Sequence, residues 1–340
     1  MRDGLREGRL VIGLSAVVIA IHDGEAVALT VRPPDLRTGT ASTLTGLPSG
    51  AFDPAGQRTF ELALRAFVTE QTGFQLGYVE QLYTFGDEGR DAPLADLGGA
   101  GDPRDGRIIS VGYLALTPEA VDTPAPDTEW TPWYRFFPYE DWRAGRPAVI
   151  DTVLAPGLRA WAARARGAAK EQRLGRARAL FALDGARWNE ERVLDRYELL
   201  YEAGLAPEAD RDRRRVSGVD APEPSAEREL GEPMVSDHRR ILATGLARLR
   251  GKIKYRPVVF ELAPAAFTLF SLQRMVEAIS GVMLHKQNFR RMVERTGLVE
   301  GLGRFDEETG GRPAELFRFR REAAAASPAS GLSLPMLREG

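Results

Sequence analysis

The order of the elements predicted in the first 150 residues is the strongest constraint on the fold. Residues 10–21 form an apolar run rich in β-branched side chains, which is typical of a buried strand. Residues 22–25, His-Asp-Gly-Glu, indicate a hairpin turn because Asp-Gly adopts positive φ at little cost, and residues 26–32 supply the partner strand. A helix at 60–72 and a further strand at 107–116 complete the pattern. This order predicts an α/β sandwich.

Composition excludes several classes of protein. The chain of 340 residues is long enough for two domains, and it has no cysteine, so it can form neither disulfides nor thiolate metal sites. Its histidines lie far apart in the sequence, which argues against a His-rich metal site. The run at 10–21 is too short to span a membrane, and the first residues lack a signal-peptide pattern. We therefore expect a soluble cytoplasmic protein with no membrane partner.

Charge is distributed unevenly along the chain. From Arg239 to Arg321 there are 17 Lys and Arg against 8 Asp and Glu, a net charge of +9, whereas the whole chain has −2. Chance clustering of surface charge is one explanation. A basic C-terminal part joined to an acidic remainder also favours a polyanionic partner such as nucleic acid at that end.

Residues 156–235 are predicted to be a helical insert and linker. Residues 159–183 are rich in Ala and Arg, which favours helices with a solvated charged face, and a DNA-binding arm is the alternative. Residues 211–215 and the following stretch 216–233, with its Pro, Ser and Glu, are typical of a mobile linker. The predicted parts are then an effector-binding sandwich at 1–155, the insert and linker at 156–235, a DNA-binding domain at 236–322, and a disordered tail at 323–340.

The C-terminal pattern predicts a winged helix-turn-helix. Thr268 is the expected N-cap of its first short helix and Gly281 the expected stop. The predicted elements are a helix at 237–250, an extended segment at 257–262, helices at 267–281 and 285–297, a loop at 300–315 and a strand at 316–320.

The helix predicted at 285–297 has two different faces. Phe289, Met292, Val293 and Thr296 lie on an apolar face that can pack on the domain. The opposite face carries long hydrogen-bond donors suited to base edges in the major groove. The predicted DNA-binding residues are Lys286, Gln287, Asn288, Arg290 and Arg291 on this helix, with Arg312 in the wing, Arg318 on the last strand, Lys254 and Thr268. A helical pair with ordinary surface arginines is the alternative.

Two parts of the chain resemble the Nudix-related transcriptional regulators, bacterial repressors of NAD-metabolism genes. Residues 252–293 and the stretch RPAELFRF at 312–319 resemble the C-terminal domain of this family, and residues 81–91 and 104–116 resemble its N-terminal domain. The long middle segment is similar to that of the alphaproteobacterial NAD-biosynthesis repressors. The resemblance implies a Nudix-like effector domain, a winged helix-turn-helix and a homodimer on a palindromic operator of double-stranded DNA.

The sequence FELALRAFVTEQTGF at residues 60–74 resembles the helix of the Nudix box, R-E-U-x-E-E-x-G-U with U aliphatic. Aligned on Gly73, Phe67 and Gln71 stand at two of the three glutamate positions of this pattern, and Glu70 is the one that is retained. One carboxylate cannot hold a catalytic Mg²⁺ as three or four can. We therefore expect neither catalysis nor a metal site.

The sandwich is still expected to bind a nucleotide effector such as ATP, NAD or ADP-ribose, with no cofactor required. Guanidinium groups match phosphate oxygens, and aromatic rings can stack on a base. The candidate effector-binding residues are Arg32, Arg37, Arg58, Glu70, Tyr83, Phe85, Arg90 and Arg107.

The sequence therefore predicts an α/β Nudix-like sandwich with a helical middle segment and a C-terminal winged helix-turn-helix. Its expected function is that of a nucleoid-associated, nucleotide-controlled repressor of NAD-biosynthesis genes, without enzymatic activity. One alternative is an active Nudix hydrolase of ADP-ribose-like nucleoside diphosphates with a regulatory DNA-binding tail. A protein-interaction adaptor that does not bind DNA is the other.

Overall fold

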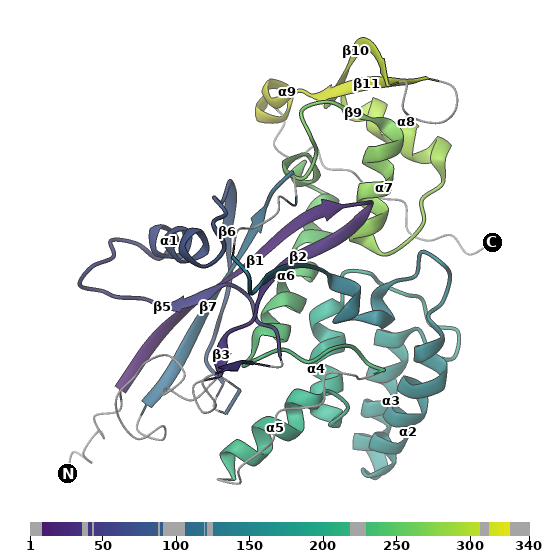
Figure 1. Ribbon diagram of the computed structural model, residues 1–340. Coiled ribbons are helices and arrows are strands. Elements are labelled where there is room, and N and C mark those ends of the chain that lie inside the picture. The colour runs from purple at the N-terminus through teal and green to yellow at the C-terminus, as the bar shows by residue number, and fades with distance from the viewer. Residues whose placement is uncertain are drawn as a thin grey trace.

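The computed structural model describes residues 9–35, 40–42, 44–87, 89–90, 106–118, 120, 125–217, 229–306 and 313–326. Figure 1 shows a central sheet with helix α1 on one side, a group of helices at the lower right, and a small domain with its own strands at the top. Within the described part of the chain, no helix is both long enough and apolar enough to cross a membrane.

The central sheet confirms the predicted hairpin and strands. Its strands run in the order β6-β7-β1-β2-β8, and β5 pairs with β1. β1 and β7 are parallel, and the other pairs are antiparallel. Asp23 and Gly24 have φ of 49° and 77°, matching the two positive values that a type I′ hairpin turn requires. The strands are β1 (Arg9–His22), β2 (Glu25–Val31), β5 (Ser49–Ala51), β6 (Tyr78–Phe85), β7 (Gly106–Leu116) and β8 (Thr128–Pro132), and a separate pair comprises β3 (Pro34–Asp35) and β4 (Thr40–Ala41).

Helix α1 (Phe60–Thr72) covers one face of this sheet and has the predicted ends. The Thr59 hydroxyl accepts a hydrogen bond from the Leu62 amide, and Gly73 closes the helix with φ of 72°. The buried face of α1 packs on side chains that point to the same side of the sheet. This core consists of Ala63, Leu64 and Val68 from α1 with Leu14, Ala16, Val18, Leu29, Val111, Tyr113 and Ala115 from the strands.

Helix α6 (His238–Ile253) covers the opposite face of the sheet. Gly245 approaches β1 so closely that a Cβ at this position would lie 2.8 Å from Val17 Cγ1. Ile241 and Leu246 share a core with Val17 and other residues of this sheet face. The predicted boundary at residue 236 placed this helix in the DNA-binding domain. In the structure α6 covers the sheet of the sandwich, through long-range packing that leaves no local signal in the sequence, and the boundary at residue 236 stays a prediction.

The middle of the chain is helical as predicted, but its charges are not all solvated. Arg196 and Glu208 are buried in helices expected to carry exposed charge. Residues 211–215 belong to a helix rather than a linker, and Arg211 is buried with its Nε 2.8 Å from Asp212. Residues 218–228 of the predicted linker lie outside the described residues. The helices are α2 (Ala155–Ala163), α3 (Gly167–Phe181), α4 (Val193–Ala203) and α5 (Pro207–Val216).

The C-terminal domain contains the predicted helix-turn-helix. Thr268 and Ser271 form a reciprocal capping box at the start of α7, and Gly281 and Gly297 end the two helices with φ of 75° and 64°. A three-stranded sheet in the order β10-β11-β9 completes the winged fold. The elements are β9 (Phe267–Thr268), α7 (Leu269–Ser280), α8 (Lys286–Thr296), β10 (Val299–Asp306) and β11 (Ala314–Phe319).

Three local predictions at this end are wrong. Residues 258–261 form a 3₁₀ helix instead of an extended segment, because Val258, Val259 and Phe260 are all buried and give no alternating pattern. Residues 299–306 form a strand where a loop was expected from 300 onward, since pairing with β11 overrides the weak propensity of a glycine-rich stretch. Residues 321–326 form helix α9, so order extends past the predicted start of the tail.

The packing of α6 on the sheet leads to a stability prediction for Gly245→Ala. Alanine usually stabilises a helix relative to glycine by about 1 kcal/mol, but here its Cβ would clash with Val17. We expect Gly245→Ala to lower the free energy of unfolding by about 1–3 kcal/mol. Gly175→Ala in α3, where a Cβ would meet no atom within 4 Å, should be neutral or stabilising. Urea denaturation of both variants checks this, and equal effects would contradict it.

Candidate DNA interface and effector site

Helix α8 presents an unpaired polar face to solvent. Phe289, Met292 and Val293 are buried against the domain, which confirms the predicted apolar face. The five predicted contact residues on the other face are exposed, and they form no hydrogen bond or ion pair with any residue that the structure describes. These are Lys286, Gln287, Asn288, Arg290 and Arg291. Their donors are therefore available to an external ligand.

Two buried polar side chains of α7 fix the turn before α8. The Gln273 amide donates to the Leu284 carbonyl at 2.8 Å, and Glu277 accepts from the Leu284 amide at 2.9 Å. Gln273 also donates to Glu277 at 2.9 Å, so both side chains have partners despite their burial. The orientation of α8 relative to α7 is thus held by directional bonds as well as by apolar packing.

Arg318 and Thr268 already have partners within the winged domain. Arg318 donates from Nε and Nη2 to the Glu300 carboxylate on the neighbouring strand, at 3.1 and 2.9 Å. Thr268 is 7% exposed and caps α7. Both residues therefore have a structural role within the winged domain, and their contact with DNA stays a prediction.

Lys254 lies at the junction with the middle helices. Its ammonium group is 2.8 Å from Glu190 and 2.5 Å from Glu191, so it is neutralised within the protein. Arg312 lies outside the described residues. Arg295 on α8 and Arg304 on β10 are also exposed, although neither was among the predicted DNA-binding residues. Arg304 could have been included if the residues after 299 had been recognised as a strand of the wing.

The two residues at lost Nudix carboxylate positions both contact the start of β5. We call residues 44–50, which comprise the loop before β5 and the first two residues of that strand, the β5 loop. Gln71 accepts from the Ser49 amide at 3.1 Å and donates to the Ser49 carbonyl at 2.6 Å. The Phe67 ring lies over Gly50, where a Cβ would be only 2.9 Å from the ring. A glutamate at position 71 could not donate to that carbonyl, so the amide has a specific structural role.

Glu70, the carboxylate retained at a Nudix-box position in α1, does not fit a Nudix metal site. Glu70 is exposed and has no ion-pair partner among the described residues. Over the same residues, no group of three or more His, Cys, Asp and Glu side chains could hold a metal ion. Mg²⁺ held for diphosphate chemistry needs several oxygen ligands. The donor set described here does not supply them.

The predicted effector contacts are divided between two edges of the sheet. Arg32 follows β2 and lies 3.9 Å from Glu129 on the edge strand β8. Tyr83 and Phe85 lie on β6, the opposite edge strand. Tyr83 is exposed, but Phe85 is 2% exposed and belongs to the core, so its ring face is not free to stack on a base. The structure does not bring these side chains into one pocket.

Arg90 is engaged with the middle helices rather than with the sandwich. Its guanidinium donates to both carboxylate oxygens of Glu198, at 3.2 and 3.0 Å, and lies 3.7 Å from the centre of the Tyr201 ring. Arg107 donates from Nε to the Gly86 carbonyl at 3.1 Å. Arg58, just before α1, is exposed, and Arg37 lies outside the described residues. Arg32, Arg58 and Glu70 are therefore the predicted effector contacts that stay accessible near α1 and β8.

Comparison with known proteins agrees with this geometry. A family model described as the NrtR DNA-binding winged helix domain matches residues 259–319. This part of the chain is therefore similar to the DNA-binding domain of the NrtR proteins. The ADPR responsive transcriptional repressor NtrR of Acinetobacter baylyi is 38% identical over 93 residues, which is 27% of this chain and 37% of that protein. The match thus spans well under two thirds of the curated relative. The crystal structure of Shewanella oneidensis NrtR has a similar fold, with a TM-score of 0.52, 21% identity, and coverage of 92% of this chain and 96% of that one.

The β5 loop also contacts α6. His238 Nδ1 accepts a hydrogen bond from the Leu47 amide at 2.9 Å, and the Val235 amide donates to the Thr45 carbonyl at 3.0 Å. Desolvation, with a smaller contribution from Arg211, lowers the pKa of His238 from 6.5 to about 4. The ring is therefore neutral at physiological pH and keeps the lone pair that this bond needs.

This depressed pKa predicts a loss of stability in mild acid. Between pH 6.5 and about 4 the unfolded chain takes up a proton at His238 more readily than the folded chain, so stability falls as pH falls through this range. The complete shift of the His238 pKa corresponds to a loss of about 3 kcal/mol in the free energy of unfolding. Urea unfolding at pH 7.5 and pH 5 should show a smaller loss for His238→Gln, which does not titrate here. Equal losses in the two proteins would contradict the prediction.

Proposed function

We propose that this chain is a DNA-binding transcriptional repressor of NAD-metabolism genes and that a nucleotide of the ADP-ribose type controls its affinity for DNA. The observation that carries the proposal is the exposed face of α8, with Arg290 and Arg291 unpaired, inside the segment that matches a DNA-binding winged helix. The name of the Acinetobacter relative, an ADPR responsive repressor, supports the same combination of activities. The alphaproteobacterial grouping and a cytoplasmic, nucleoid-associated location stay predictions.

Two copies of the chain would act together on a palindromic operator. One short recognition helix reads too few base pairs for genomic specificity, whereas a two-fold dimer reads two half-sites. In each copy Gln287, Asn288, Arg290 and Arg291 would contact base edges, because bidentate donors of this kind distinguish bases in the major groove. Lys286 is suited to phosphate as a point charge. Arg312 and Arg318 would contact the backbone from the wing.

The effector would bind near α1 and the β5 loop. Arg32 and Arg58 carry exposed guanidinium groups in this part of the sandwich, and a diphosphate would pair with them. The name of the Acinetobacter relative favours ADP-ribose over ATP or NAD. Binding without a metal is consistent with the donor set around Glu70.

A gel-shift titration tests the repressor proposal. We expect a sequence-specific shift with DNA from NAD-biosynthesis promoters or from the region upstream of this chain's own gene, and a change in affinity when ADP-ribose is added. Arg290→Ala or Arg291→Ala should weaken binding by about 1–3 kcal/mol if the residue reads a base. Arg248→Ala, on an exposed surface of α6 and paired with Glu80, is the control and should bind normally.

The pattern across sequences separates the possible outcomes of this titration. A loss restricted to certain operator sequences assigns the arginine to a base, whereas an equal loss on all sequences assigns it to phosphate. If the wild-type chain gives no specific shift under any nucleotide condition, the repressor proposal fails. The adaptor alternative predicts that result.

The absence of hydrolysis is a separate part of the proposal. Gln71→Glu restores the second carboxylate of the Nudix pair but removes the donor to the Ser49 carbonyl. We expect this variant to remain inactive on ADP-ribose with Mg²⁺ and to lose about 1 kcal/mol of stability. Gln75→Glu, also exposed, is the matched control. Chromatography of the nucleotides and urea unfolding measure the two effects, and clear turnover by the wild-type chain would favour the hydrolase alternative.

A further inference from the structure

We propose that helix α6 transmits the state of the β5 loop to the helix-turn-helix. The inference rests on the proposed function, because it takes the Nudix-like sandwich as the effector-binding domain. The helix has 16 residues and so is about 24 Å long. Its first turn contacts the β5 loop and its last turns contact the C-terminus of α7, so one rigid element spans the two sites.

The contacts at the first end of α6 leave the β5 loop little freedom. His238 accepts from the Leu47 amide, and Val235 bonds to Thr45 just before the helix begins. A Cβ on Gly46 would lie 2.7 Å from Val235 Cγ2 and 2.9 Å from His238 Nδ1. Gln71 of α1 holds the other end of the loop through Ser49. A ligand that moves this loop must therefore break these contacts or move α6.

The contacts at the far end of α6 attach it to the DNA-binding domain. The fully buried Arg250 donates from Nε to the Ile279 carbonyl at 2.8 Å, in the last turn of α7. Its Nη1 donates to Glu140 at 2.6 Å. Tyr134, which precedes Glu140 in the chain, donates to the Ala278 carbonyl at 2.8 Å. Two neighbouring carbonyls of α7 are thus held by groups outside the winged domain.

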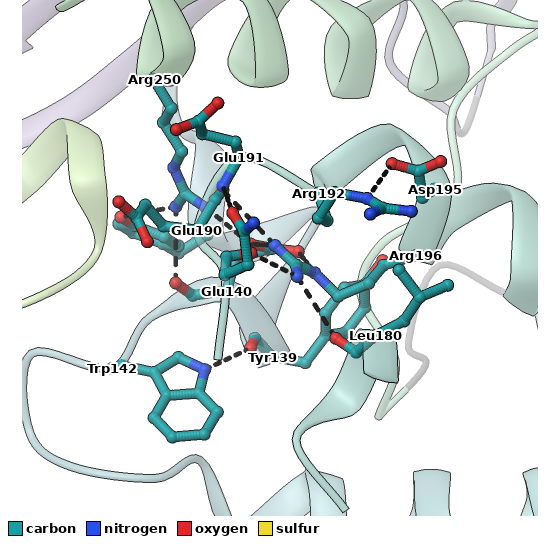
Figure 2. Close-up of polar contacts among 12 residues, drawn as sticks. Tyr139, Glu140, Trp142, Leu180, Glu190, Glu191, Arg192, Asp195, Arg196 and Arg250 are labelled. Atoms are coloured by element: carbon teal, nitrogen blue, oxygen red, sulfur yellow. Dashed lines mark hydrogen bonds and ion pairs between the residues drawn. The ribbon is translucent and has the colours of Figure 1, made fainter. Parts of the chain in front are cut away.

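A buried cluster of charges makes this attachment rigid. Figure 2 shows Glu140 between the side chains of Arg250 and Arg196, and all three are fully buried. Arg196 of α4 donates to Glu140 from Nε at 2.5 Å and from Nη2 at 2.8 Å. Separating one buried charge from its partners is strongly unfavourable. The end of α6, the Glu140 segment and α4 should therefore move as one unit.

The turn that leads into α8 is packed against the same unit. There is no room for a side chain at Gly281, because a Cβ there would lie 2.4 Å from the Glu140 carbonyl oxygen. Its own carbonyl accepts from the Trp142 amide at 2.7 Å. Gln273 and Glu277 then fix α8 to α7 through Leu284. A displacement of α6 is therefore carried to the exposed face of α8 instead of being absorbed at a hinge.

A variant of His238 tests the proposal in the full-length chain. His238→Leu removes the acceptor for the Leu47 amide while keeping an apolar side chain of similar size, and His238→Gln offers an amide oxygen in its place. The quantity measured is the ratio of operator Kd with and without saturating ADP-ribose. Allosteric ratios are typically about 5–150-fold. We expect the ratio to fall close to 1 in His238→Leu and to recover in His238→Gln.

Arg248→Gln is the matched control for this experiment. Arg248 lies on the same helix, 42% exposed, and pairs with Glu80, so its loss should leave the ratio as in the wild type. A folded His238→Leu protein with the full wild-type ratio would overturn the role of α6 and leave the repressor proposal intact. A wild-type ratio of 1, with ADP-ribose bound by calorimetry, would overturn both.

Hydrogen–deuterium exchange on the wild-type chain keeps the proposal testable if His238→Leu does not fold. Adding ADP-ribose should change the exchange of amides in α6 and at the end of α7, in addition to those near the β5 loop. A change confined to the loop and α1, together with altered operator affinity, would show that the signal takes another route.

Discussion

The arrangement of this molecule depends on one buried carboxylate, that of Glu140. It lies between Arg196 and Arg250, and the three side chains come from segments far apart in the sequence. A carboxylate and two guanidinium groups removed from water are tolerated only with close partners and good geometry, so the three segments must meet in one arrangement. The apolar core continues through the same region, from the sheet through the middle helices to the winged domain. The chain is therefore a single connected body in which the DNA-binding domain has a defined orientation.

The helix-turn-helix of the winged domain could be predicted well because its signals are local. The helix caps at Thr268 and Gly281 and the alternation of apolar and polar positions in α8 depend on residues within a turn or two of each other. The hairpin at Asp23 and Gly24 is local in the same sense. Each of these features is decided by neighbouring residues, and tertiary contacts only reinforce it.

The assignment of residues to sites stays a prediction, because it depends on partners that are distant in the sequence. Arg90 was expected at a phosphate but meets Glu198, 108 residues away, and Lys254 was expected at DNA but meets Glu190 and Glu191. Nothing near these residues in the sequence distinguishes a cation that will be neutralised internally from one that stays free. The position of α6 could not be predicted for the same reason. Whether a helix covers a sheet or begins a new domain depends on which distant residues its apolar face packs against.

The pairing of Gln71 with Ser49 restricts which side chains position 71 can carry. An amide bonds to both the N–H and the C=O of one residue, whereas a carboxylate can only accept, so a glutamate at position 71 could not make this pair of contacts. Phe67 stands at another glutamate position of the Nudix pattern, and its ring packs on Gly50. Reversion at either position alone would loosen the loop before any metal could bind. Holding this loop firmly and carrying the Nudix carboxylates are therefore competing demands on the same two side chains.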